Sequence, residues 1–159
     1  MTKIISAIMI VLLVAACNTK YGEMGLTGGV TAQPITSNVY RIVARGNAYT
    51  GGTAIQDFAL LKAAETAKAT GHNYFQIVSS NNATSTSIGQ TAGFSQTNVY
   101  GAAAFTTYTP GYVYDIIKPG QDLYIRVFTL PRGTSPPPGS YSAAEIIANI
   151  GPRVKRADN

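Results

Sequence analysis

Residues 53–79 decide the fold: TAIQDFALLKAAETAKAT (Thr53–Thr70) is followed directly by GHNYFQIVS. Alanine, leucine, lysine and glutamate, all strong helix formers, fill the first segment, and Thr53 with Gln56 has the spacing of a capping box. Gly71 is a natural residue just after a helix C-terminus. The second segment is rich in aromatic and β-branched residues, which favours a strand. The stretch therefore predicts a helix followed by a strand.

Working outward, the segment before this helix alternates as a half-buried strand does. In residues 38–48, Tyr40, Ile42 and Ala44 face one way, and the intervening residues face the other. Strand, helix and strand in this order predict a crossover unit. Three small helix residues would let the helix lie close to a sheet: Ala63, Ala64 and Ala67.

Further elements are expected on the C-terminal side. Residues 79–98 are polar and of low complexity, which indicates a mobile loop or an exposed ribbon, and residues 100–108 could form a strand. Two β-rich runs, 112–117 and 122–129, flank Pro119-Gly120, a pair that favours a tight turn and hence a hairpin. Ser142-Ala-Ala-Glu145 is a second capping box, which opens a short helix that ends at Gly151-Pro152.

The N-terminus has the features of an export signal. Lys3 precedes an apolar run, Ile4–Ala16, which spans roughly 20 Å as a helix and is too short for a hydrocarbon core of ~30 Å. The run ends Leu13-Val-Ala-Ala-Cys17, which resembles the bacterial lipobox. That resemblance implies cleavage between Ala16 and Cys17 and a diacylglyceryl group on the Cys17 sulfur. An ordinary secretory leader is the alternative, and it would be cut at the same bond.

Composition excludes several classes of protein. Hydrophobic residues make up 45% and charged residues 12% of the chain, which does not fit intrinsic disorder. The net charge is +5, but no basic stripe indicates nucleic-acid binding. The single cysteine excludes an internal disulfide and a cysteine-cluster metal site. Three basic residues near the C-terminus form a solvated tail or contact anionic lipid headgroups: Arg153, Lys155 and Arg156.

No set of residues predicts catalysis, a metal or a cofactor. His72 is the only histidine and follows a helix-ending glycine, so a surface turn is expected. Asp57 and Glu65 lie about two turns apart on one helical face, where carboxylates could do acid–base work. A solvated face is favoured, because Lys62 and Lys68 lie within reach of Glu65. An envelope hydrolase with an acidic site remains the alternative to a non-catalytic protein.

Tyrosines mark the expected contact surface for a partner. The chain has 10 tyrosines and no tryptophan, and tyrosine is common at interfaces. The alternative is ordinary ring packing on the surface of a sheet. The residues expected to contact an envelope protein lie in the predicted hairpin: Tyr112, Tyr114, Tyr124 and Phe128.

Several motifs together resemble a family of small, uncharacterised proteobacterial lipoproteins. The resemblance covers roughly residues 28–150, and the Ala-Ala-Glu helix is its most specific part. It implies a lipid-anchored envelope protein and no particular activity. The motifs are Tyr40-x-Ile42 leading to Gly46-Asn47, Ala63-Ala64-Glu65 in the helix, and Gly71-x-x-Tyr74-Phe75.

These observations predict an α+β protein with a mixed or antiparallel sheet of four to five strands and two helices on one face. We expect a signal peptide (1–16), a flexible lipid-anchored tether (17–37), a globular domain (38–151) and a basic tail (152–159). The tether is expected to pass into a short strand near residues 30–35. The protein would be anchored through lipid on Cys17. In the enterobacterial sorting rule, an Asp directly after the lipidated cysteine keeps a lipoprotein in the inner membrane. Asn18 occupies that position here, so the expected location is the outer membrane, facing the periplasm. The expected role is that of a structural or protein-interaction module.

Overall fold

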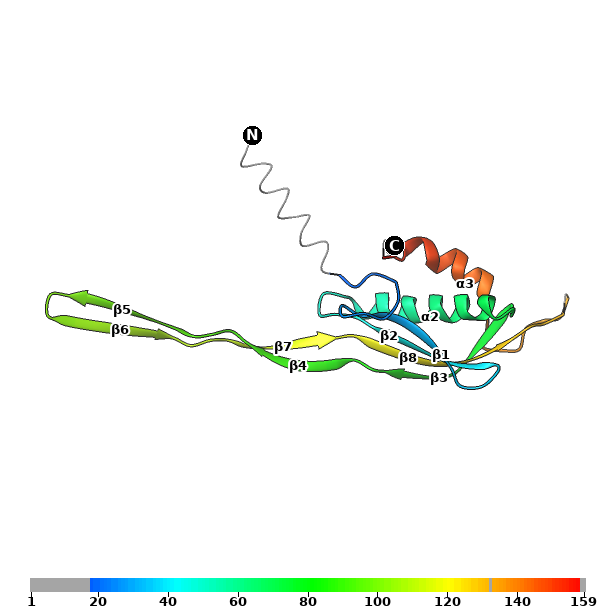
Figure 1. Cartoon of the computed structure of the whole chain (residues 1–159), viewed down its shortest axis with the longest axis horizontal. Coiled ribbons are helices and arrows are strands. Elements are labelled where there is room, and N and C mark those ends of the chain that lie inside the picture. Colours follow the sequence, from blue (N-terminus) through cyan, green and yellow to red (C-terminus); the bar gives the residue numbers. More distant parts are fainter. Residues whose placement is uncertain (1–17, 132, 158–159) are drawn as a thin grey trace, which may run out of the picture. The chain divides into compact units, whose positions relative to one another are not determined.

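The computed structural model describes residues 18–131 and 133–157 (Figure 1). Their contacts divide the chain into two compact units. The first unit, here called the base domain, comprises the described residues up to Ser85 and from Lys118 onward. The second, here called the ribbon, comprises Thr86–Ile117. A single domain over 38–151 was expected, and the structure corrects this to a domain with an inserted second unit.

The base domain is an α+β fold built on a five-stranded antiparallel sheet in the order β1-β2-β8-β3-β9. Its helices are α2 and α3, and a 3₁₀ turn, η1, follows α3. Figure 1 shows both helices on one side of the sheet. The predicted fold class is therefore confirmed. The bounds are β1 Gly29–Pro34, β2 Val39–Arg45, α2 Gly52–Ala69, β3 Tyr74–Asn82, β8 Gly120–Phe128, β9 Ser140–Ser142, α3 Ala143–Ile150 and η1 Gly151–Arg153.

Helix α2 forms where the sequence predicts it, but its N-terminus is capped differently. The helix begins at Gly52, so Thr53 lies inside its first turn, and no side chain bonds to the cap at Gly51. The expected capping box at Thr53 is therefore wrong. At the other end, Gly71 adopts a φ of 80°, and the backbone N–H of His72 donates to the carbonyl of Ala67. This is the expected glycine stop, in the form of a Schellman motif.

The alanines of α2 explain both its close packing and its weak amphipathic pattern. Ala59, Ala63, Ala64 and Ala67 are fully buried. The helix contacts four strands of the sheet and also α3, so it is covered on two sides. A helix that is buried on two sides shows no single apolar stripe.

The core lies between the sheet and α2. Leu123, Ile125 and Val127 of β8 are buried, as the predicted alternation requires. Strands β2 and β3 flank the central strand β8 and run antiparallel to it. The predicted crossover from β2 through α2 to β3 is therefore present, with a strand from much later in the chain inserted between its two strands.

The expected tether and basic tail are folded parts of the base domain. Thr19 and Tyr21 are buried, and residues 29–34 form β1. The Thr19 hydroxyl accepts a hydrogen bond from the backbone N–H of Asn47 (2.9 Å) and donates one to the backbone carbonyl of Thr27 (2.6 Å). Near the C-terminus, Val154 is buried. The tether over 17–37 and the tail over 152–159 are therefore wrong for their described residues, but the short strand expected near residues 30–35 is confirmed as β1. Cys17 and the leader lie outside the described residues.

The structure also corrects the predicted hairpin around Pro119-Gly120. Strand β7, Val113–Lys118, leads through Pro119 into β8, but β7 pairs with β4 and β8 pairs with β2 and β3. The Pro119 carbonyl accepts the Gly46 amide at 2.8 Å. A Cβ at Gly120 would lie 2.4 Å from the Ala83 carbonyl oxygen. The glycine allows this close approach of two backbones and makes no turn.

Candidate interaction ribbon

The ribbon is formed by two pairs of antiparallel strands. Strand β4, Ser85–Gln90, pairs with β7, and β5, Phe94–Tyr100, pairs with β6, Ala103–Thr109. Gly101, at a φ of 61°, and Ala102 connect β5 to β6. A glycine with positive φ at the first position of a two-residue loop fits a type II′ turn. The ribbon interpretation of residues 79–98 is therefore confirmed over β4 and β5.

Apolar side chains are concentrated on the surface of the ribbon. Of the sixteen exposed large hydrophobic residues among the described part of the chain, ten belong to the ribbon. No described ribbon residue is buried. Contiguous exposed apolar surface marks interaction sites on soluble proteins. The ten residues are Ile88, Phe94, Val99, Tyr100, Phe105, Tyr108, Tyr112, Val113, Tyr114 and Ile117.

Charge is almost absent from the same segment. Asp115 is the only Asp, Glu, Lys, Arg or His between residues 86 and 117. Surface strands normally carry charges, and lysine in particular protects exposed sheet edges. A count of charges along the sequence would have drawn attention to this segment. The polar composition of its first half, taken alone, predicts only a loop or an exposed ribbon.

The two arms of the ribbon fit each other through aromatic and small residues. A Cβ at Gly89 would lie 2.6 Å from the ring of Tyr114, so the glycine makes room for that ring. Ser95 is the register partner of Tyr108. The hydroxyls of Thr97 and Thr106 are 2.8 Å apart across the pair. Small and large side chains therefore lie opposite one another in both directions, with Ser95 opposite Tyr108 and Tyr100 opposite Ala103.

The structure does not bring the four predicted contact residues together in one hairpin. Tyr112 and Tyr114 lie on the ribbon and are exposed. Tyr124 and Phe128 lie on β8 of the base domain and are half-buried. The ring of Phe128 stacks on Tyr74, with centroids 6.0 Å apart. Aromatic ribbon residues outside the predicted set are also exposed, and Phe105 is more exposed than Tyr114.

The acidic residues considered for catalysis form ion pairs with the C-terminal segment. Asp57 accepts two bonds from the guanidinium of Arg153, at 2.7 and 2.9 Å. Glu65 accepts a bond from Arg156 at 2.7 Å, and Lys62 pairs with Glu23. These carboxylates hold the C-terminal segment against α2. The expected pairing of Glu65 with lysines of its own helix is replaced by Arg156.

Tyr21 completes this arrangement from the N-terminal side. Its hydroxyl donates to Glu65, and the guanidinium of Arg156 lies 5.0 Å from the centre of its ring. Burial, and then the hydrogen bond to Glu65, raises the pKa of the Tyr21 hydroxyl. The hydrogen bond to Glu65 likewise raises the pKa of Arg156. His72 lies at the helix end as expected, with its Nδ1 3.1 Å from the Thr70 hydroxyl.

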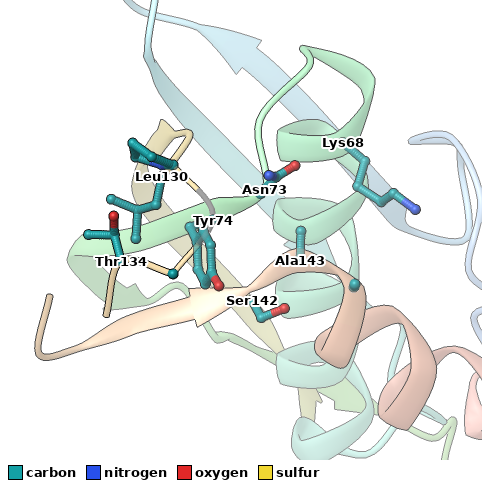
Figure 2. A pocket seen from close by; sticks show the side chains of 10 residues that line it. Lys68, Asn73, Tyr74, Leu130, Thr134, Ser142 and Ala143 are labelled. Carbon is teal, nitrogen blue, oxygen red and sulfur yellow. The ribbon is translucent and has the colours of Figure 1, made fainter. Parts of the chain in front are cut away.

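Two of the hollows on the base domain have linings rich in polar or charged residues. The first has a volume of about 230 Å³, and Figure 2 shows the side chains that line it. Lys68 is the only charged residue among the described lining residues, and polar groups come from Asn73, Tyr74, Thr134 and Ser142. That set offers no nucleophile beside a base. The other, of about 490 Å³, is lined by residues from both ends of the described chain. They include Asn18, Lys20, Arg153 and Lys155, with Phe58 and Val154 as apolar members.

Within residues 18–131 and 133–157, no helix is long and apolar enough to span a membrane, and no group of three or more potential metal ligands is present. No family model, curated protein or solved structure matches the chain.

Proposed function

We propose that this chain is an exported lipoprotein, cut between Ala16 and Cys17 and anchored by lipid on Cys17. The lipobox ending at Cys17 and the short apolar run before it support this proposal. The resemblance to small proteobacterial lipoproteins supports it as well. Because Asn18 and not Asp follows the cysteine, we place the protein at the outer membrane, facing the periplasm.

Such an anchor would hold the base domain close to the lipid surface. Only Asn18 separates Cys17 from Thr19, which is buried and bonded to the loop before α2. The hollow beside this end of the chain is lined by Lys20 and Lys155 and by Arg153, which is paired with Asp57 in the same lining. Each basic residue near an anionic lipid surface contributes about 1 kcal/mol to the free energy of membrane binding. The proposed anchor and these basic residues would therefore turn the same side of the base domain toward the membrane.

The role of the anchored protein, in this proposal, is a non-catalytic interaction through the ribbon. The observation that carries it is the set of ten exposed apolar side chains on a segment with one formal charge. A two-stranded ribbon without other packing is marginally stable in water. Binding to another β-structure or to an apolar surface would remove those side chains from water. Aromatic residues such as Tyr112 and Tyr114 are typical of interface hot spots.

The anchor is tested by labelling cells with radioactive palmitate. We expect the wild-type chain and a matched Asn18→Ser variant to incorporate label, and Cys17→Ser to remain an unlabelled precursor. Label in the Cys17→Ser variant would refute the anchor.

The interaction role is tested by photo-crosslinking in intact cells. A photoreactive residue at Tyr112 should give protein crosslinks, whereas one at the exposed Lys68 of α2 should give few. Equal yields at the two positions would refute binding through the ribbon.

A further inference from the structure

The edges of the ribbon strands are unprotected. In the described part of the chain, β4-β7 and β5-β6 are two-stranded sheets, so each strand has one neighbour and one open edge. An open edge presents unpaired N–H and C=O groups to any compatible strand. Apart from Pro110, which lies between β6 and β7, the ribbon has no proline to block such pairing.

The edges of the base domain, in contrast, are blunted. One edge strand, β1, ends at Pro34, and the other, β9, is only three residues long. Short edge strands and prolines are the usual means of preventing edge-to-edge association. The same chain thus protects one sheet and leaves the other open.

The best available partner for each open edge is the opposite arm of another copy. Within one copy, β5 and β6 already pair over seven residues, with Phe94 opposite Thr109 and Tyr100 opposite Ala103. The arm with β6 and β7 in a second copy has identical side chains. It can therefore repeat these pairings on the outer edge of β4 and β5.

Charge favours this identical partner. Copies of a charged segment repel one another, and a heterologous partner is commonly selected by complementary charge. The only charged residue of the ribbon is Asp115, near its base, so two ribbons do not repel each other strongly. For the same reason the ribbon has no pattern of charges that would select a different partner. What remains is backbone pairing and contact of aromatic with small side chains, and both are satisfied by a second copy.

We propose that copies of this chain associate head to tail through their ribbons, with the β4–β5 arm of one copy paired to the β6–β7 arm of the next. A head-to-tail contact leaves a free edge at each end of the assembly unless a ring closes. We therefore expect assemblies of more than two copies, because each added copy leaves an edge to which the next can pair. This inference rests on the proposed interaction role of the ribbon, and it names the partner.

The arrangement is tested by crosslinking two differently tagged full-length lipoproteins in the same cells. One carries Gln96→Cys and the other Thr107→Cys, and these positions are register partners within a copy. The only native cysteine, Cys17, is consumed by lipid in the proposed anchor. A short bis-maleimide should join the two tags at least five-fold more than it joins two copies that both carry Lys68→Cys.

Two results would overturn the head-to-tail contact. The first is a cross-tag yield no higher than that of the Lys68→Cys control. The second is a preference for crosslinks between two Gln96→Cys copies, because that pairing requires a two-fold contact between identical arms.

A second measurement is the mass of the purified lipoprotein in mild detergent. We expect a multimer for the wild type, the mass of one copy for Ser95→Lys with Thr107→Lys, and an unchanged multimer for the uncharged control Ser95→Thr with Thr107→Val. A single copy in the wild type would refute self-association.

The same measurements separate this inference from the proposed function. A wild-type single copy whose ribbon crosslinks to another envelope protein would overturn the inference and leave the interaction role intact. A single copy whose ribbon cysteines are shielded from maleimide only by vesicles of phosphatidylethanolamine and phosphatidylglycerol would identify lipid as the partner, and would also overturn the inference.

Discussion

The base domain and the ribbon satisfy the backbone and the apolar side chains in opposite ways. In the base domain, Phe75 and Ile42 of the sheet and Leu61 of α2 are fully buried, and α2 covers four strands of the sheet. In the ribbon, Phe94 and Phe105 have 62% and 63% of their surface exposed. Strands are paired in both units, so the difference lies in what covers the strands. Hydrogen bonding alone forms a ribbon, whereas a stable domain also needs a second layer.

The largest difference in stability is expected between two phenylalanine substitutions, one in each unit. Phe75→Ala removes a fully buried ring and should lower the free energy of unfolding by about 3–5 kcal/mol. Phe105→Ala removes an exposed ring and should change it by less than about 0.5 kcal/mol in the isolated chain. Urea unfolding followed by circular dichroism measures both. Similar losses in the two variants would mean that the ribbon contributes to the same core.

A second pair of substitutions compares two glycines that have no room for a Cβ atom beside their neighbours. Gly120→Ala would place a Cβ 2.4 Å from a backbone oxygen of Ala83, which cannot move alone, and should cost about 1–3 kcal/mol. Gly89→Ala would meet the ring of Tyr114, which is half exposed and free to turn aside, and should cost less. Thermal unfolding of the two variants checks this order. The reverse order would show that the ribbon is the more tightly packed unit.

Removal of the Tyr21 hydroxyl tests how firmly the N-terminal segment is held to the base domain. Tyr21→Phe loses the bond to Glu65 and should cost about 1–2 kcal/mol at neutral pH. Folding raises the pKa of Tyr21 above its ordinary value of 10.0, so its contribution is complete below about pH 10 and declines as the pH rises further.

The stability difference between wild type and Tyr21→Phe should therefore shrink above that pH. Denaturant unfolding at pH 7, 9 and 11 measures it, and Tyr49→Phe at an exposed position is the control. A difference that stays constant or grows up to pH 11 would contradict the burial of this hydroxyl.

The smallest effect is expected for removal of the ribbon as a whole. Replacing residues 86–117 with Asn-Gly between Ser85 and Lys118 joins two paired strands by a favourable turn. The unfolding free energy of the base domain should change by less than about 0.5 kcal/mol, while crosslinks through the ribbon disappear. A base domain that fails to fold without the ribbon would show that the two units depend on each other.

The sequence by itself determined the elements whose signals are local. The helix-forming composition of residues 53–70, the glycine after it and the alternation in β2 and β8 each reflect contacts between near neighbours or one buried face, so these elements were predicted nearly in place. The cap at Ser142, whose hydroxyl accepts the Glu145 amide at 3.4 Å, is equally local. The α+β class follows from the order of these elements.

The pairing of distant segments was decided only in the tertiary structure. Pro119-Gly120 has the composition of a turn, yet Gly120 is needed where it passes Ala83, a contact that no local pattern encodes. The segment from Thr19 to Gly29 has the composition of a tether, yet Thr19 bonds to Asn47 and Tyr21 to Glu65. In the candidate site, the tyrosines of the ribbon could be identified from sequence, but their pairing with a polar strand could not. Strand pairing depends on contacts between residues far apart in the chain, whereas composition and periodicity describe only near neighbours.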